Sequence, residues 1–151
     1  MTKLEYLDGQ FFFNLDADVG KMSPNRIEDV ELVRFGYFCK KSNPRALLLM
    51  SAREKVSVLA LQPRGPYRSD LQEAIDAHQE NRGGTQDGKV SVGKPQLSHG
   101  ERYDRAHVWI IFTLCYNLAA VLPNIYPRID LHDQSGPEIS KRVRELFGVV
   151  Y

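Results

Sequence analysis

Four histidines are the residues of this chain best suited to metal binding or proton transfer. Neutral imidazole is a common zinc ligand, and the carboxylates of Asp130 and Asp133 could complete such a site. No two of the histidines have the spacing of a ligand pair, however, so a structural role for each is the stronger interpretation. The sequence therefore predicts no metal. The four are His78, His99, His107 and His132.

Residues 16–20, Asp-Ala-Asp-Val-Gly, have the composition of the start of a calcium-binding loop. In such a loop a glycine stands at the sixth position and a bidentate glutamate at the twelfth. Here Gly20 comes one place early, and Ile27 occupies the glutamate position. The pattern does not predict calcium.

Known catalytic motifs are missing from the sequence. It has no Gly-x-Ser-x-Gly elbow, phosphate-binding loop, His-Glu-x-x-His pair or dinucleotide-binding glycine fingerprint. A glycan hydrolase needs two carboxylates opposed across a cleft. Glu80 and Glu101 are candidates only because they flank one loop region. We therefore predict no catalytic residue and no cofactor, and favour a binding role over an enzyme.

Residues 74–90, AIDAHQENRGGTQDGKV, have the most distinctive spacing in the chain. An apolar Ala-Ile pair, a glutamine, a Gly-Gly pair and an Asp-Gly turn follow one another at fixed intervals. This order resembles the second half of the small helical peptidoglycan-binding-like domain. Residues 29–35, DVELVRF, resemble the first-helix signature of that family, with Arg34 where the family has Gln. The resemblance implies a helical fold and a binding domain.

The binding site implied by this resemblance is a groove between the first helix and the helix that contains Gln79. Arg34, Gln79, Arg82 and Asp87 would offer hydrogen bonds or charge to an acidic, amide-rich cell-wall peptide. Aromatic rings could supply flat contact surfaces for sugar or peptide. The candidates are Tyr37, Tyr67, Tyr103 and Trp109.

Two functions remain open at this point. In the first, a non-catalytic adaptor domain binds a protein partner within a bacterial secretion or phage-type assembly. In the second, the groove binds muropeptide or peptidoglycan, and a cell-wall hydrolase is a more distant alternative. The N-terminus favours the adaptor, because Glu5 and Asp8 interrupt the apolar run that a signal peptide needs. We expect a protein that is cytoplasmic as synthesised, exported only by a signal-independent route if at all.

The elements that would position these residues predict a mainly α fold, a compact helical domain of about five helices with a short N-terminal β-hairpin. Residues 4–7 and 11–13 flank an Asp-Gly-Gln turn that suits the hairpin. A first helix capped by Ser23 or Asn25 ends near Cys39. Residues 44–61 favour helix, although a strand near 56–61, and hence an α+β fold, is the alternative.

In the second half, Ser69 or Asp70 would cap a helix that runs through Gln79, and residues 89–100 form a loop. Residues 106–122 are the most apolar segment and predict a central helix, buried nearly all round, in preference to a membrane span. Surplus apolar surface on it would form a homo-oligomer interface.

The last segment, after an irregular stretch at 126–133, predicts a helix capped by Ser135 with Pro137 in its first turn. Four residues would form its buried face and three its solvent-exposed basic face. The buried set is Ile139, Val143, Leu146 and Phe147, and the basic set is Lys141, Arg142 and Arg144.

Length and composition indicate one domain over residues 1–151. The peptidoglycan-binding-like core would span about 24–92 with an enlarged connection at 44–67, and residues 104–148 would add C-terminal helices. The net charge of +1 gives no field that favours nucleic acid. Residues 36–70 carry seven basic and two acidic side chains, whereas residues 1–35 carry four and seven. Cys39 and Cys115 are far apart in apolar surroundings and predict buried, reduced thiols.

Overall fold

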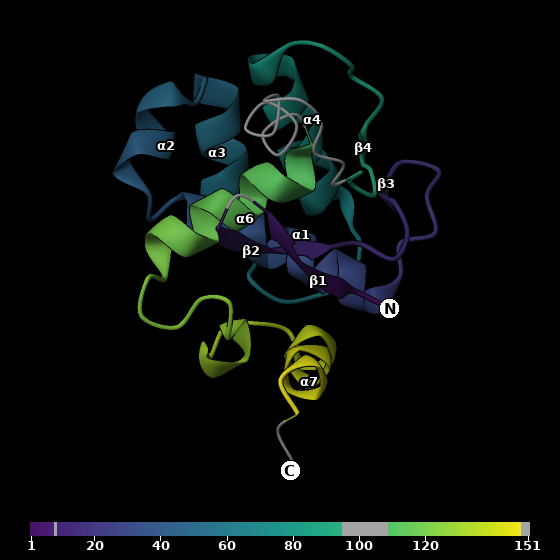
Figure 1. The fold of residues 1–151 in the computed structure, drawn as a ribbon. Coiled ribbons are helices and arrows are strands. Elements are labelled where there is room, and N and C mark those ends of the chain that lie inside the picture. Colours follow the sequence, from purple (N-terminus) through teal and green to yellow (C-terminus); the bar gives the residue numbers. More distant parts are fainter. Residues whose placement is uncertain (8, 95–108, 149–151) are drawn as a thin grey trace, which may run out of the picture.

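The computed structural model describes residues 1–7, 9–94 and 109–148, and shows the predicted mainly α fold within them (Figure 1). The described strands are β1 (Lys3–Leu7), β2 (Gln10–Asn14), β3 (Val19–Gly20) and β4 (Lys89–Val90). The described helices are α1 (Ile27–Lys40), α2 (Pro44–Leu49), α3 (Ala52–Ala60), α4 (Ser69–Arg82), α6 (Ile110–Val121) and α7 (Pro137–Leu146), with a 3-10 helix η1 (Ile129–Leu131).

The predicted N-terminal hairpin is confirmed. Strands β1 and β2 are antiparallel and pair Leu4 with Phe13 and Tyr6 with Phe11. Successive side chains of a strand point to opposite faces, which explains how the neighbours Phe12 and Phe13 are both fully buried. The ring of Phe12 packs edge-on against Phe112 of α6, whereas Phe13 packs against Tyr126 on the other face.

Helix α1 lies at the centre of the molecule, with eleven of its fourteen residues buried. It packs against α3, α6 and α7 (Figure 1). The predicted caps were wrong: the helix begins at Ile27, and Arg26 stands at the N-cap with no side-chain cap. Asn25 instead closes the preceding loop, because its side chain accepts from the Gly20 N–H (2.7 Å) and donates to the Gly20 carbonyl (3.0 Å).

Residues 44–61 form two helices, so the alternative strand at 56–61 was wrong. Asn43 caps α2 by accepting from the N–H groups of Arg45 and Ala46. Ser51 caps α3 by accepting from the N–H of Glu54. The cap at Ser51 separates the segment into two helices because it satisfies the first turn of α3 independently of α2.

Helix α4 begins at Ser69, so Ser69 and Asp70 lie in its first turn and Arg68 takes the N-cap position. After it, Lys89 and Val90, predicted as loop, pair with β3 as the short strand β4. Residues 95–100 of that predicted loop lie outside the described residues.

The predicted apolar helix is confirmed as α6 over Ile110–Val121, and only Ala120 of these residues is exposed. Residues 106–108 of the prediction lie outside the described residues. It is not the central helix, since α1 is more completely enclosed. None of its large apolar side chains is exposed, so this helix offers no surplus apolar surface, and self-association through 106–122 stays a prediction. In the described ranges no helix is long and apolar enough to cross a membrane.

Helix α7 begins at Pro137 as expected, but the predicted Ser135 cap was wrong. Gly136 is the N-cap residue, and the Ser135 hydroxyl bonds to the His132 carbonyl and to Ser140. The cap comes from α1 instead, where Glu31 accepts from the Glu138 N–H. Ile139 and Val143 are fully buried as predicted.

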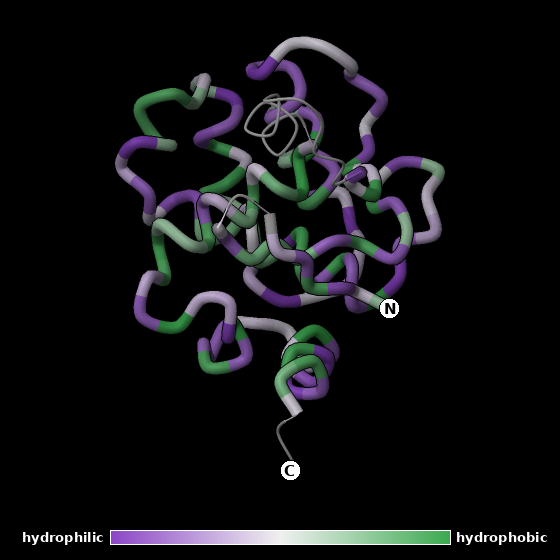
Figure 2. Tube along the Cα trace, in the orientation of Figure 1, coloured by the Kyte–Doolittle hydropathy of each residue, from purple (hydrophilic) through white to green (hydrophobic). Residues whose placement is uncertain are grey.

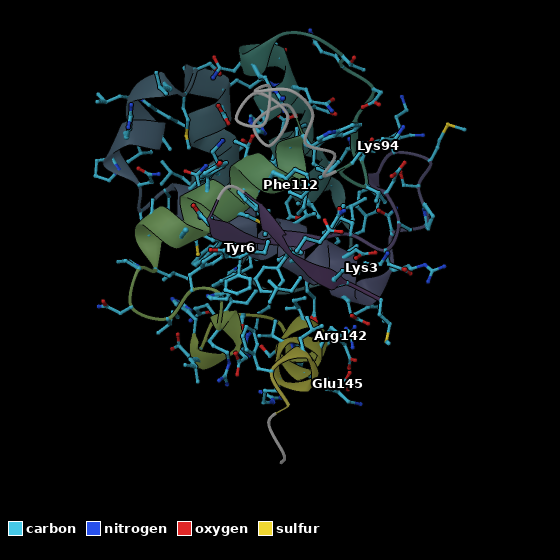
Figure 3. All side chains as sticks on the ribbon, viewed as in Figure 1. Lys3, Tyr6, Lys94, Phe112, Arg142 and Glu145 are labelled. Carbon is cyan, nitrogen blue, oxygen red and sulfur yellow. The ribbon has the colours of Figure 1, made fainter. Side chains whose placement is uncertain are left out.

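Two predicted faces of α7 need correction. Phe147 is 38% exposed and follows the end of the helix. Arg142 is not simply solvated, because its Nε donates to the Thr2 carbonyl (3.0 Å) and its Nη1 lies 3.4 Å from Glu145 (Figure 3). Arg142 on this basic face therefore binds the N-terminal segment to α7.

Candidate functional site

The glutamine of the 74–90 segment organises the turn that follows it. Gln79 Nε2 donates to Asp87 Oδ1 (3.1 Å) and to the Lys89 carbonyl (2.8 Å), while its Oε1 accepts from the Gly88 N–H (2.8 Å). Gln79 is buried, and the Ala-Ile pair at 74–75 is fully buried beneath it. The spacing that resembles the family motif thus describes a helix clamped to its own following turn.

Glycine is required in this turn for two reasons. Gly88 has a φ of +74°, which side chains rarely adopt, and a Cβ there would come 3.1 Å from Gln72 Nε2. Its carbonyl is also occupied, since it accepts from Gln72 Nε2 (2.9 Å) and from the Lys21 N–H (3.0 Å). The turn therefore joins α4 to the chain that enters α1.

Arg34 lies in the interior, fully buried, and not in a groove. Its guanidinium forms a fork with Asp70, with nitrogen–oxygen distances of 2.8 and 3.1 Å. It also donates to the backbone carbonyls of Gln62 and Pro66. The hydrogen bonds from Arg34 lower the pKa of Asp70. Arg34 therefore attaches α1 to the α3–α4 connection and to the start of α4.

Tyr37 is also fully buried, and its hydroxyl lies 2.7 Å from His78 Nδ1 on α4. Burial raises the pKa of Tyr37 well above its usual value and lowers that of His78 to about 2. Beside them, the buried Lys40 ammonium contacts Glu54 Oε2 at 2.8 Å. The Arg34 and Tyr37 side chains thus fill the space between α1 and α4, where the groove was expected.

The five predicted binding residues therefore lie in different environments. Arg34 and Tyr37 are interior, and the exposed Asp87 accepts hydrogen bonds from Gln79 and from the Lys89 N–H. Arg82 is exposed at the end of α4. Gln79, Arg82 and Asp87 line one pocket of about 500 Å³ together with Trp109. Tyr67 and Trp109 are half-buried, and Tyr103 lies outside the described residues.

The predicted lack of a metal site stays a prediction for the whole chain. In the described ranges no three His, Cys, Asp or Glu residues gather as ligands. Asp16 and Asp18 of the calcium-like pattern bind Arg26 and the Val92 N–H respectively. Glu80 pairs with Arg53. His99, His107 and Glu101 lie outside the described residues.

Both cysteines are buried free thiols, as predicted. Burial raises the pKa of Cys39 and of Cys115 to about 12 in each case. Reactive cysteines are exposed and have lowered pKa values, so neither thiol is a candidate nucleophile.

The surface of α2 and α3 carries the apolar feature that sequence reasoning missed. Leu48 is 85% exposed and Leu49 73% exposed on α2, and Val56 and Leu59 are 68% and 64% exposed on α3. We call these four side chains the α2–α3 surface. No residue of α2 is buried. Figure 2 shows hydrophobic residues in the part of the chain that forms α2, at the upper left of the view.

A signal for this surface was present in the sequence. Consecutive helical residues are rotated by about 100°, so the three leucines at 47–49 cannot all face one side of a short helix. A single surface helix with this run must expose part of it.

Two exposed positive side chains lie on the same helices as the α2–α3 surface. Arg45 and Lys55 are exposed, and neither pairs with an acid among residues 1–7, 9–94 and 109–148. Arg53 is committed to Glu73 and Glu80. Val56 also borders a shallow depression of about 390 Å³ between α3 and α4. Helices α2 and α3 thus carry exposed apolar side chains and two exposed cations.

Comparisons with family models, with curated proteins and with solved structures found no match to this chain.

Proposed function

We propose that this chain is a non-catalytic binding domain that docks a protein partner through the α2–α3 surface. The observation that carries the proposal is helix α2, which has no buried residue and exposes Leu48 and Leu49. Fully burying a leucine contributes about 1.5–3 kcal/mol, so covering both would contribute about 3–6 kcal/mol before the cost of association. Leu48 and Leu49 are adjacent on α2, and large exposed apolar patches mark interaction sites.

The charges on the same two helices favour an acidic partner segment. Arg45 on α2 and Lys55 on α3 are exposed, and neither pairs with an acid in the described part of the chain. A complementary partner presents apolar side chains at helical spacing, flanked by carboxylates. An amphipathic acidic helix has this chemistry.

The same surface is poorly suited to muropeptide. Leucine and valine side chains offer no hydrogen bonds to sugar hydroxyls or peptide amides, which such a ligand requires. The buried Arg34 and Gln79 also have their polar atoms directed at the protein. The bacterial secretion or phage-type assembly implied by the motif resemblance remains the proposed setting for the partner.

The proposal is tested by selecting binders from a displayed library of amphipathic helical peptides. The native chain is compared with the double variant Leu48→Ser/Val56→Ser, and Gln86→Ala serves as the control because Gln86 is exposed elsewhere. We expect acidic, leucine-rich peptides that bind the native chain and the control equally, and the double variant at least about tenfold more weakly.

Two results would overturn this function. One is a failure to select any peptide whose binding depends on Leu48 and Val56. The other is retention of the native chain on purified cell-wall sacculi with the double variant retained equally, which would favour the peptidoglycan alternative.

A further inference from the structure

The N-terminal hairpin is a sheet of two strands, so each strand has one edge that the hairpin itself does not pair. Such an edge presents N–H and C=O groups to which another strand can bond. The outer edge of β2 is occupied. The Phe11 carbonyl accepts from the Tyr126 hydroxyl (2.6 Å), and the Phe13 carbonyl accepts from Cys115 Sγ (3.5 Å). Of these two strands, β1 therefore has the edge that a further strand could join.

The same two contacts show which residues of β1 face outward. In an antiparallel pair only every second residue bonds to the opposite strand. Phe11 and Phe13 bond outside the hairpin, and they stand opposite Tyr6 and Leu4. The N–H and C=O groups of Leu4 and Tyr6 therefore point away from β2. Within residues 1–7, 9–94 and 109–148 these groups make no hydrogen bond.

Arg142 marks one limit of this free edge. Thr2 is on the same edge, and its carbonyl accepts from Arg142 Nε (3.0 Å). Lys3 and Tyr6 lie toward opposite ends of β1 in Figure 3, and Arg142 lies nearer the Lys3 end. Tyr6 is 63% exposed, so the other end is open to solvent. The free edge is thus short and accessible.

Two charged residues on β1 lack an ionic partner in the described part of the chain. Lys3 is exposed and forms no ion pair there. Glu5 is half-buried and accepts one hydrogen bond, from Asn14 Nδ2 (3.3 Å). They stand two residues apart on the same face of the strand. An incoming strand with the opposite order of charges would pair with both.

A second copy of β1, running antiparallel, has this order in one register only. Residues that face outward must oppose residues that face outward, so Leu4 stands opposite Leu4 or Tyr6, or Tyr6 stands opposite Tyr6. The second register places Glu5 opposite Glu5, which is destabilising. The third places Lys3 opposite Gly9, outside β1. The first places Lys3 of each copy opposite Glu5 of the other.

We propose that two copies of this chain associate through their β1 strands, antiparallel about a two-fold axis, with each Lys3 opposite a Glu5. The two Leu4 residues form the central hydrogen-bonded pair. The Lys3–Glu5 pairs beside it are of the non-hydrogen-bonded kind, in which opposing side chains come closest. The N–H of Tyr6 meets the Thr2 carbonyl of the other copy, which accepts through its second lone pair.

This contact joins two hairpins into one continuous sheet. It is independent of the proposed docking function, because β1 has no residue in the α2–α3 surface. It also differs from association through residues 106–122. Because the paired segment is short, the dimer is a weak one, with a dissociation constant on the order of 0.1–1 mM.

Isotope-filtered NOE spectra of a mixture of ¹³C-labelled and unlabelled chain test the register at millimolar concentration. In a non-hydrogen-bonded antiparallel pair the two Cα atoms are about 4.5 Å apart. We therefore expect an NOE between Lys3 Hα of one copy and Glu5 Hα of the other. An NOE between the two Glu5 Hα atoms would contradict the proposed register.

Charge reversal tests the pairing by sedimentation equilibrium. Lys3→Glu should weaken self-association at least about tenfold, because it places like charges opposite each other twice. Glu5→Lys should do the same. Lys21→Glu reverses an exposed lysine outside β1 and is the matched control, which should associate as the native chain does. An equimolar mixture of Lys3→Glu and Glu5→Lys should associate again, since opposite charges then meet in both pairs.

Four results of these experiments would overturn the proposal. They are a native chain that stays monomeric at millimolar concentration, equal weakening by Lys3→Glu and Lys21→Glu, no association of the mixed variants, and a dimer that Lys3→Glu leaves unchanged. The last result would place self-association on another surface, such as residues 106–122.

Discussion

Glu31 on α1 caps helix α7, because its carboxylate oxygens lie 2.8 and 3.2 Å from the backbone nitrogen of Glu138. The contact is close enough that a Cβ on Gly136 would come 2.1 Å from Glu31 Oε2. An exposed helix N-terminus thus obtains its acceptor from the centre of the molecule, 107 residues earlier in the chain.

Replacing this cap should loosen α7. Glu31→Ala is expected to lower the free energy of unfolding by about 1–2 kcal/mol, because it removes the acceptor for the first turn of the helix. Urea denaturation measures the change. Glu145→Ala, in the last turn of the same helix, should change it by less than about 0.5 kcal/mol. Equal losses in the two variants would show that Glu31 does not act as a cap.

Glu31 should also give a pH dependence of defined sign. Burial raises its pKa in the folded state above the usual 4.5. The folded protein then binds the proton more tightly, so the contribution of Glu31 to stability is greatest below pH 4.5 and falls as pH rises through the folded pKa. The unfolding free energy of the native chain minus that of Glu31→Gln, which cannot titrate, should therefore fall as pH rises over that interval. A rise of this signed difference with pH would contradict the assignment.

Arg34 should prove structural. Arg34→Ala is expected to cost about 3–5 kcal/mol, the range for breaking a buried ion pair. Arg34→Lys should recover little of this, because lysine cannot form the fork with Asp70. The measurement is chemical denaturation, with Arg68→Ala as an exposed arginine control. Native stability after Arg34→Ala would return Arg34 to the set of candidate ligand contacts.

Removing the Gln79 side chain tests whether the 74–90 motif has a structural role or a binding role. Gln79→Ala removes three hydrogen bonds to residues 87–89 and should cost about 1–3 kcal/mol. Gln86→Ala, an exposed amide, should be neutral within about 0.5 kcal/mol. Binding of peptides selected on the α2–α3 surface should be unchanged in both variants. A loss of that binding with Gln79→Ala but normal stability would contradict an architectural role.

The sequence predicted the helices better than their ends. Apolar periodicity located α1, α4, α6 and α7, because burial of one face is a property of the local pattern. The cap of α7 was missed since its acceptor, Glu31, is distant in sequence. Asn25 was misjudged because its side chain closes a loop at Gly20 instead of capping a helix.

The candidate site was harder to predict than the fold. Polar residues such as Arg34 and Gln79 resemble ligand contacts in a sequence, but here they satisfy buried carboxylate and backbone groups. On α2, Leu48 and Leu49 are exposed, which was not predicted. Which residues face solvent depends on tertiary packing, and local composition does not determine it.

The exposure of Leu48 on α2 and of Val56 on α3 can be checked by measuring the stability of variants. Leu48→Ser/Val56→Ser should change the free energy of unfolding by less than about 1 kcal/mol, because both side chains are already in water. Leu71→Ala, at a fully buried leucine, should cost about 2–5 kcal/mol. A loss with the double variant as large as that with Leu71→Ala would mean that α2 packs against the protein in solution.

Site-specific photocrosslinking in cells that make this protein tests the docking function most directly. A photoreactive residue at position 48 should give one discrete adduct with another protein, which disappears when Val56→Ser is added. The same residue at position 86 should give no such adduct. Identical adducts from both positions, no adduct from position 48, or an adduct with a second copy of this chain would contradict the proposed docking of a protein partner on α2 and α3.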